Sequence, residues 1–240
     1  MRAGPSIEPM DSIRVVGGNP LSGSVTVHGA KNAVLKHMVA MLLAPGHYRL
    51  DNVPGILDDD IMGEVLDHVG ATCVRRGSVI EVDVPEGLNP EAPLGLVRKM
   101  RASILILGAL LARVGSARVA LPGGDDFGSR PIGMHVDGLE QMGASFELRH
   151  GVLEASAPNG LSGTEVFLEF PSVGATENLL LAAVLAKGRT VIGNAAREPE
   201  LADLASLLNA MGAKVDGAGT STIEVMGVPA LSPTNHTAVA

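Results

Sequence analysis

The phrases LDHVGA (66–71), LEQMGA (139–144) and LNAMGA (208–213) decide the fold of this chain. Their glycines stand at 70, 143 and 212, so successive copies are 73 and 69 residues apart. Each phrase ends an amphipathic helix, and its glycine stands where a helix C-cap needs a left-handed residue. A repeat of this period indicates three copies of one structural unit.

The same elements are predicted around each phrase. An amphipathic helix leads into the phrase, and two strand-like runs joined by a turn follow it. A more apolar helix precedes each unit, at 31–44, 101–114 and 175–188, and helices apolar on most sides belong in an interior. The sequence therefore predicts an α/β fold in which residues 31–228 form three units. These would pack with pseudo-threefold symmetry, with buried helices at the centre and sheets outside.

The composition indicates a folded acidic protein without a nucleic-acid or membrane partner. The 240 residues are 46% hydrophobic and 18% charged, which allows a substantial core. The net charge of −8 and the aromatic content of 2% exclude a broad basic face and base-stacking platforms. The longest apolar stretch, 104–112, is shorter than the roughly 20 residues of a membrane span. A single cysteine and no secretory signal predict a cytoplasmic protein.

The two ends of the chain differ from the repeated region. Residues 1–10 are predicted to be a disordered leader, and Met10 is a second candidate start. Residues 229–240 are small and polar, and the pattern predicts neither a helix cap nor a strand there. We therefore expect this last segment to be a linker or a truncated tail.

The segment PGGDDFGSRP (122–131) is the most unusual stretch of the sequence. Its adjacent glycines permit positive φ and a close approach of the backbone to a ligand. Asp125 and Asp126 are available acids, and Arg130 is a cation next to Pro131. The residues alone leave two interpretations open, an active-site loop or a surface turn rich in turn-forming residues. The spacing is not that of a nucleotide P-loop.

Three cations are candidates for a local anion site: Lys31, Arg101 and Arg130. Lys31 and Asn32 begin the first apolar helix, where free N–H groups and the helix dipole favour a phosphate. Arg101 opens the second apolar helix, where it must find a partner. For Lys31 the alternative is a side chain that extends to solvent.

Other polar residues carry weaker signals. The seven histidines show no paired metal spacing, so with a single cysteine we expect no metal site and no cofactor. His135 lies in the first turns of a helix, as a core, solvated or ligand-facing residue. Asp58, Asp59 and Asp60 begin an amphipathic helix, and capping explains them. The sequence lacks the GxSxG and GxGxxG patterns of hydrolases and dinucleotide-binding proteins.

Five longer stretches together resemble the enolpyruvyl transferase family, in family order from residue 13 to about 228. MRASILILG (100–108) stands where the shikimate-pathway branch has a GNAGT-type segment, so the resemblance favours the amino-sugar branch. The stretches are IRVVGGNPLSGSVTVHGAKNAVL (13–35), KMRASILILGALLAR (99–113), LPGGDDFGSRPIGMHVDGLEQMGA (121–144), PSVGATENLLLAAVLAKG (171–188) and NAAREPELADLASLLNAMGA (194–213).

The resemblance implies one lobe of a two-lobed fold. Each lobe is an inside-out α/β barrel of three repeated βαβαββ-like units with buried helices. Family enzymes are roughly twice as long, so the chain corresponds to the N-terminal half, and residues 11–30 would form strands that join the missing second lobe. The expected partner is that lobe, in cis or in trans, and the chain alone is expected to be inactive. The alternative is a non-catalytic UDP-sugar-binding module or paralogue that pairs with another chain.

The implied reaction moves the enolpyruvyl group of phosphoenolpyruvate to the 3′-hydroxyl of UDP-N-acetylglucosamine, with release of phosphate, in peptidoglycan synthesis. The resemblance places Lys31 and Asn32 at phosphoenolpyruvate, and Arg101 and Arg130 at the substrate anions. Fixed cations suit a substrate that carries a phosphate and a carboxylate together. The residues that would line the UDP-sugar site are Arg130, Pro131, Ile132, Gly133, Met134, Phe170, Pro171, Ser172 and Val173.

The resemblance implies a catalytic set of Asp125, Lys31 and Arg130. Many family members have a cysteine where this chain has Asp125, and an aspartic acid with a raised pKa can serve as the general acid there. Asp126 is the alternative acid. The epoxide fosfomycin alkylates the thiolate of the cysteine-bearing members. A carboxylate is a weaker nucleophile, so we expect insensitivity to that drug.

Overall fold

Three stretches of the chain have the same order of elements: helix, strand, helix and two strands. The structure, a computed structural model, describes residues 14–18, 20–92, 94–97, 104–120 and 132–240. The first stretch contains α1 (Lys31–Met41), β1 (Gly46–Asp51), α2 (Leu57–His68), β2 (Thr72–Arg76) and β3 (Val79–Val84). The second contains α4 (Ile106–Val114), β4 (Ser116–Ala120), α5 (Gly133–Gln141), β5 (Ser145–Arg149) and β6 (Val152–Ser156). The third contains α6 (Val173–Ala183), β8 (Arg189–Gly193), α7 (Pro199–Ala210), β9 (Lys214–Asp216) and β10 (Thr222–Met226).

Each stretch forms its own sheet. The strand between the two helices pairs antiparallel with the last strand, as β1 with β3, β4 with β6 and β8 with β10. Two further short strands join in parallel: β7 (Glu165–Phe167) pairs with β8, and β11 (Asn235–Thr237) pairs with β1. The strand orders are β11-β1-β3-β2, β4-β6-β5 and β7-β8-β10-β9, and one short helix, α3 (Leu94–Val97), lies between the first two stretches. The fold is therefore α/β with mixed sheets.

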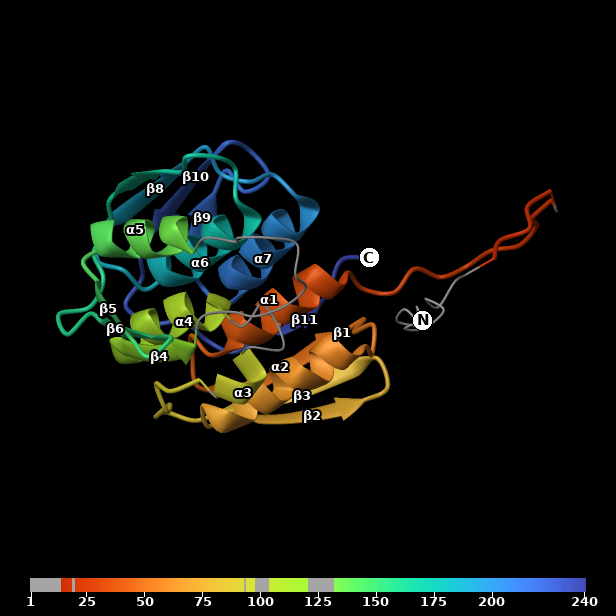
Figure 1. Ribbon diagram of the computed structural model, residues 1–240, viewed down its shortest axis with the longest axis horizontal. Coiled ribbons are helices and arrows are strands. Elements are labelled where there is room, and N and C mark those ends of the chain that lie inside the picture. The colour runs from red at the N-terminus through yellow and green to blue at the C-terminus, as the bar shows by residue number, and fades with distance from the viewer. Residues whose placement is uncertain (1–13, 19, 93, 98–103, 121–131) are drawn as a thin grey trace, which may run out of the picture.

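The predicted apolar helices lie inside the molecule. Residues Ala33–Met41 of α1, Ile106–Leu111 of α4 and Ala175–Ala183 of α6 are buried throughout. Figure 1 shows these helices between the sheets, which lie on the periphery. Helices that are apolar on every side satisfy burial only in such a position. Among the described residues, no helix has the length and apolar character needed to cross a bilayer.

The repeated phrase forms the same helix end three times. Gly70, Gly143 and Gly212 all have positive φ, at 109°, 98° and 103°. The N–H of Ala71 donates to the carbonyl of Leu66 at 3.0 Å, which is the six-residue hydrogen bond of a Schellman motif. The prediction that these glycines are C-caps is confirmed. The other two copies make the corresponding bonds, Ala144 to Leu139 and Ala213 to Leu208, both at 3.0 Å.

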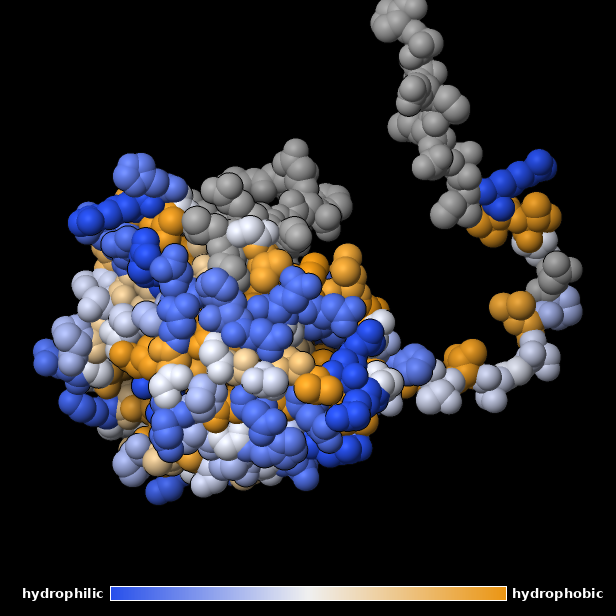
Figure 2. All heavy atoms as spheres, turned by 90° about the horizontal axis from the view of Figure 1, so that it is seen from below, coloured by the Kyte–Doolittle hydropathy of each residue, from blue (hydrophilic) through white to orange (hydrophobic). Residues whose placement is uncertain are grey.

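The N-terminal segment contains no helix or strand in its described residues 14–18 and 20–30. It runs away from the body of the molecule in Figure 1, and its apolar side chains give it orange patches in Figure 2. Val15, Leu21 and Val25 are 84%, 97% and 91% exposed. Exposed apolar side chains in such a row indicate a surface that another part of a protein would cover.

The C-terminal segment differs from the prediction. Residues 229–240 were expected to contain no strand, yet Asn235–Thr237 forms β11 at the edge of the first sheet. Ala238 is buried, and the carbonyl of Val239 accepts from the N–H of Ala30 at 2.7 Å. The expectation of a strandless end was wrong because a three-residue strand has too few residues to show a periodicity. Its pairing partner β1 lies far away in the sequence.

Candidate functional site

A cavity of about 330 Å³ lies where the first turns of α1, α5 and α6 approach one another. Three helix beginnings around one space bring N–H groups and positive potential to it, which favours an anion. The segment just before α4 contributes an apolar part of the wall. The lining residues are Asn32, Lys36, Ile104, Leu105, His135, Ser172, Val173, Gly174, Glu177 and Glu200.

The start of α6 is held in place by local hydrogen bonds. The Oγ of Ser172 accepts from the N–H of Ala175 at 3.3 Å, which is an N-cap bond. The hydroxyl of Thr176 donates to the carbonyl of Ser172 at 2.8 Å and accepts from the N–H of Ala196 at 3.1 Å. The sequence SVGAT therefore forms a fixed helix start at the cavity wall. In contrast, α1 has no side-chain N-cap.

A buried amide orients His135 at the cavity wall. The Oδ1 of Asn178 accepts from the N–H of Gly108 at 2.8 Å, which leaves its Nδ2 as the donor. That Nδ2 lies 2.9 Å from Nδ1 of His135. The Nδ1 atom therefore accepts, and in the neutral imidazole the proton is on Nε2. The ring of His135 is thereby fixed in orientation and tautomer beside the cavity.

Lys36 and Glu177 form a buried ion pair at the same wall. The Lys36 Nζ lies 3.5 Å from Oε1 of Glu177, and their side chains are 8% and 1% exposed. Burial raises the pKa of Glu177 to about 7, while the charge of Lys36 opposes that rise. Neither carboxylate oxygen of Glu177 has a hydrogen-bond partner within the described part of the chain. The pair therefore supplies a cation and a proton-accepting group to the cavity wall at neutral pH.

The structure brings some of the sequence-predicted residues together and separates others. Asn32, Ser172 and Val173 line the cavity, and Ile132, Gly133 and Met134 lie directly before His135 at the start of α5. Five of the predicted residues lie outside the residues that the structure describes: Arg101, Asp125, Asp126, Arg130 and Pro131.

Three predicted residues lie away from the cavity lining. The Nζ of Lys31 forms an ion pair with the carboxylate of Asp58 in the first turn of α2. Pro171 lines a neighbouring cavity with Asn194, Arg197 and Glu198, and Phe170 is 53% exposed. The three aspartates at the start of α2 were expected to act in capping, and Asp59 does so, since its Oδ2 accepts from the N–H groups of Gly55 and Ile56.

Sequence reasoning missed Lys36, Glu177 and Glu200 as cavity residues. A signal was present for two of them, because Lys36 and Glu177 are charged residues within helices that are mostly apolar. Such residues are almost never fully buried unless they are paired. The opposite charges of Lys36 and Glu177, each on a helix predicted to be buried, therefore indicate that the two side chains form an ion pair. Glu200 has no such signal, since a carboxylate in the first turn of a helix is ordinary.

Another cavity and a cluster of possible metal ligands are further candidate sites in the described residues. A cavity of about 250 Å³ is lined by Asp59, Asp60, Glu64 and Asp67, whose carboxylates would repel a phosphate. Among the described residues, one group could hold a metal ion: His37, Asp203 and His236. None of these three lines the 330 Å³ cavity. The site that suits an anionic substrate is therefore separate from the histidine cluster.

Comparison with known sequences identifies close relatives. The family model described as EPSP synthase (3-phosphoshikimate 1-carboxyvinyltransferase) matches residues 15–240. The UDP-N-acetylglucosamine 1-carboxyvinyltransferase of Mycobacterium leprae (strain TN) is 54% identical over 222 residues, and that of Corynebacterium jeikeium (strain K411) is 52% identical over 229 residues. These matches cover 92% and 95% of this chain but 53% and 54% of the relatives. The chain thus spans about half the length of the curated relatives it matches.

Solved structures agree with the sequence match. The enolpyruvyl transferase NikO from Streptomyces tendae matches with a TM-score of 0.79 at 26% identity, over 92% of this chain and 53% of that one. An EPSP synthase from Acinetobacter baumannii matches with a TM-score of 0.72 at 21% identity, over 90% of this chain and 49% of that one, which is a likeness of fold. With the family model matching residues 15–240 and close relatives of the same kind, the chain belongs to the EPSP synthase family of enolpyruvyl transferases.

Proposed function

We propose that the chain is the N-terminal half of a UDP-N-acetylglucosamine 1-carboxyvinyltransferase. The whole enzyme would move the enolpyruvyl group of phosphoenolpyruvate to the 3′-hydroxyl of UDP-N-acetylglucosamine and release phosphate. The observation that carries this proposal is the cavity at the starts of α1, α5 and α6, in a chain 54% identical to a relative of that name. Helix N-termini and a buried lysine at one cavity suit a substrate with two anionic groups.

Different residues of this chain would bind phosphoenolpyruvate and the UDP-sugar. Asn32 and Lys31, at the start of α1, would bind phosphoenolpyruvate, and Arg101 and Arg130 would neutralise the substrate anions. Asp125 would be the general acid, with Asp126 as the alternative. The segments 130–134 and 170–173 would hold the UDP-sugar. For Lys31 this requires that its ammonium leave Asp58 for the substrate. A phosphate carries more charge than one carboxylate and is a stronger partner for a lysine.

As the N-terminal half of such an enzyme, the chain would form one of its two lobes. The three stretches of helix, strand, helix and two strands would form one inside-out α/β barrel, which is one lobe of the whole enzyme. The exposed apolar residues of segment 14–30 support a role for residues 11–30 as strands of the second lobe. Residues 1–10 would be a leader, and the residues of 229–240 outside β11 would be a linker or a truncated tail.

The isolated chain would fold and bind but not turn over. A closed cleft needs groups from both lobes, because charge that develops as phosphate departs must be stabilised without water. The reaction forms and breaks C–O bonds by acid–base chemistry, so the proposal assigns no role to a cofactor. The partner of this chain would be the C-terminal lobe, in cis or in trans.

A second candidate function is a UDP-sugar-binding module without transferase activity. The observation that favours it is that residues of this chain alone line the cavity. In this case the chain would bind UDP-N-acetylglucosamine and pair with another protein. The two candidates differ in one property, the release of phosphate when the second half is supplied.

The test is an assay of phosphate release from both substrates. The chain is measured alone and fused to the second half of the M. leprae relative, and UDP-N-acetylglucosamine binding to each is measured by calorimetry. We expect release only from the fusion, and a loss on the order of 10²–10³ in rate for Lys31→Ala in it. The matched control is Lys214→Ala, because Lys214 is exposed on β9 and does not line the cavity. Binding without release in the folded fusion would favour the second candidate.

A further inference from the structure

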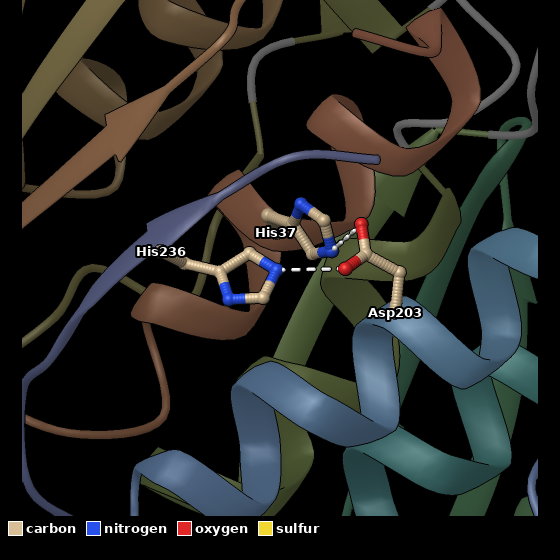
Figure 3. A group of neighbouring side chains, drawn as sticks. All are labelled: His37, Asp203 and His236. Carbon is tan, nitrogen blue, oxygen red and sulfur yellow. Dashed lines mark hydrogen bonds and ion pairs between the residues drawn. The ribbon is translucent and has the colours of Figure 1, made fainter. Parts of the chain in front are cut away.

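Three side chains from distant parts of the sequence converge in one cluster. His37 lies on α1, Asp203 on α7 and His236 on β11, and Figure 3 shows the carboxylate facing both imidazoles from one side. His37 is fully buried, and the side chains of Asp203 and His236 are each 12% exposed. The cluster thus has a closed inner side and a narrow access from solvent.

The ligand atoms of this cluster lie close to one another. The Oδ1 of Asp203 is 2.9 Å from Nε2 of His236, and its Oδ2 is 3.3 Å from Nε2 of His37. All three side chains offer ligand atoms within 4.8 Å of one another. In a tetrahedral zinc site with bonds of about 2.0–2.1 Å, neighbouring ligand atoms are about 3.3 Å apart. The observed spacing therefore needs only small adjustments of the side chains.

His37 is incompletely satisfied by its surroundings. Neither of its ring nitrogens makes a hydrogen bond of adequate geometry among the described residues, although the ring is completely buried. Buried polar atoms in native proteins almost always have a partner, and each exception calls for an explanation. A metal ion between the Nε2 atoms and the carboxylate would supply a partner for one of these nitrogens.

We propose that His37, Asp203 and His236 bind a zinc ion. Two imidazole nitrogens and one carboxylate oxygen form a donor set that suits Zn²⁺, whereas Mg²⁺ and Ca²⁺ prefer sets made of oxygen. A metal ion binds the neutral imidazole of each histidine through the lone pair of its Nε2 atom. The fourth position would be open to water on the exposed side.

The zinc ion would be structural. Since none of the three ligands lines the candidate substrate cavity, the ion would take no part in the transfer reaction. It would instead fasten β11 to the buried helix α1 and to the amphipathic helix α7. The C-terminal segment already docks there, since the N–H of Val239 donates to Oδ2 of Asp203 at 2.9 Å. A metal at this point would hold the chain end where β11 pairs with β1.

The three proposed ligands cannot be found by searching the sequence for the spacings typical of metal sites. The sequence showed no pair of histidines with metal spacing, and on that ground no metal site was expected. Spacing rules apply to ligands on one helix or one loop, whereas these three come from three separate elements. Only the packing of β11 and α7 near α1 brings them together.

The test is direct zinc binding by the 240-residue chain. Protein freed of metal with a chelator is titrated with ZnCl₂ by calorimetry, and the Zn²⁺ retained after dialysis is counted by mass spectrometry. Cobalt(II) serves as a spectroscopic probe, because its visible absorption reports a tetrahedral site with nitrogen ligands. The variants are His236→Gln and Asp203→Asn, which alter partly exposed side chains. The matched control is His47→Gln, since His47 pairs with Asp83 at 2.9 Å on the surface without a third ligand.

We expect one zinc ion per chain, binding weakened at least about tenfold in both cluster variants, and unchanged binding in His47→Gln. Zinc at about a hundred times its Kd should raise the unfolding midpoint of the wild-type chain by about 5 °C or more, and that of the cluster variants by less. Circular dichroism would establish that the variants are folded. Absence of stoichiometric binding to the wild-type chain, or equal affinity in folded cluster variants, would overturn the proposal. Phosphate release plays no part in this test, so it is independent of the proposed function.

Discussion

The Nζ atom of Lys36 lies 3.5 Å from Oε1 of Glu177, and this buried ion pair joins helix α1 to helix α6 at the wall of the candidate substrate cavity. Each residue is the partner that allows the other to be buried. The pair therefore connects the packing of the interior helices with the electrostatics of the site.

Replacing one residue of the Lys36–Glu177 pair should lower the free energy of unfolding. The size of the loss should depend on whether the other residue is still present. We expect Lys36→Met to lower the free energy of unfolding by about 1–3 kcal/mol, less than the 3–5 kcal/mol typical of a broken buried pair. The reason is that Glu177, with its pKa near 7, can take up a proton when the ammonium is gone. A double-mutant cycle with Glu177→Gln, measured by urea denaturation, should give a coupling of about 0.5–3 kcal/mol. Additive effects of the two changes would contradict this view. The exposed pair Arg149 and Glu147 is the control and should show a smaller coupling.

Glu177 should make stability depend on pH. Its pKa is raised from 4.5 to about 7 by burial, so between these values the folded state keeps a proton that the unfolded state has lost. The contribution of Glu177 to stability is therefore present at low pH and falls as the pH rises through that window, by about 3 kcal/mol at most. Urea denaturation of the wild-type chain and of Glu177→Gln at several pH values isolates this effect. Parallel stability curves for the two proteins would show that Glu177 titrates normally.

Gly108 should not tolerate a side chain. A Cβ at this position would lie 2.3 Å from Oδ1 and 2.4 Å from the carbonyl oxygen of Asn178. We expect Gly108→Ala to destabilise the chain by about 1–3 kcal/mol, because helices α4 and α6 must move apart. The change should also disturb His135, which Asn178 orients. Thermal unfolding, with the histidine resonances as a second readout, measures both. Gly87→Ala is the control, since nothing lies within 4 Å of a Cβ there, and a similar loss in both variants would refute the steric explanation.

Cys73 should react slowly with thiol reagents. Burial, which has the largest effect, and the neighbouring Asp67 together raise the pKa of its thiol to about 12. The thiolate is the reactive form, so little of it exists at neutral pH. Intact mass spectrometry after treatment with iodoacetamide should show slow labelling of the native chain and rapid labelling in urea. Equal rates in both conditions would show that the thiol is not protected.

The residue at position 125, in the glycine-rich segment 122–131, should decide sensitivity to fosfomycin. In the fusion with a second half, we expect Asp125→Cys to keep transfer activity and become sensitive to the drug, because a thiolate attacks an epoxide more readily than a carboxylate does. Asp125→Asn should lose most activity, since an amide cannot serve as the acid. Mass spectrometry after incubation with fosfomycin and UDP-N-acetylglucosamine detects the adduct. A wild-type adduct in the loop, or full activity of the Asn variant, would favour Asp126 as the acid.

Much of the local structure could be predicted from the sequence. The helix predicted at 31–44 is α1 (Lys31–Met41), and the glycines at 70, 143 and 212 cap their helices as the repeated phrase indicates. Helix periodicity and left-handed caps depend on residues a few positions apart, so a short stretch of sequence contains the information. The family could be recognised for the same reason, since its characteristic stretches are continuous.

The candidate site could be predicted only in part, and the cluster of His37, Asp203 and His236 could not be predicted at all. Asn32, Ser172 and Val173 line one cavity, while the ion pairs of Lys31 with Asp58 and of Lys36 with Glu177 join residues from separate helices. The convergence of His37, Asp203 and His236 likewise depends on β11, a strand too short to have a pattern. Which distant side chains meet is set by the packing of helices and sheet edges, because burial and pairing energies act between neighbours in space whatever their separation along the chain.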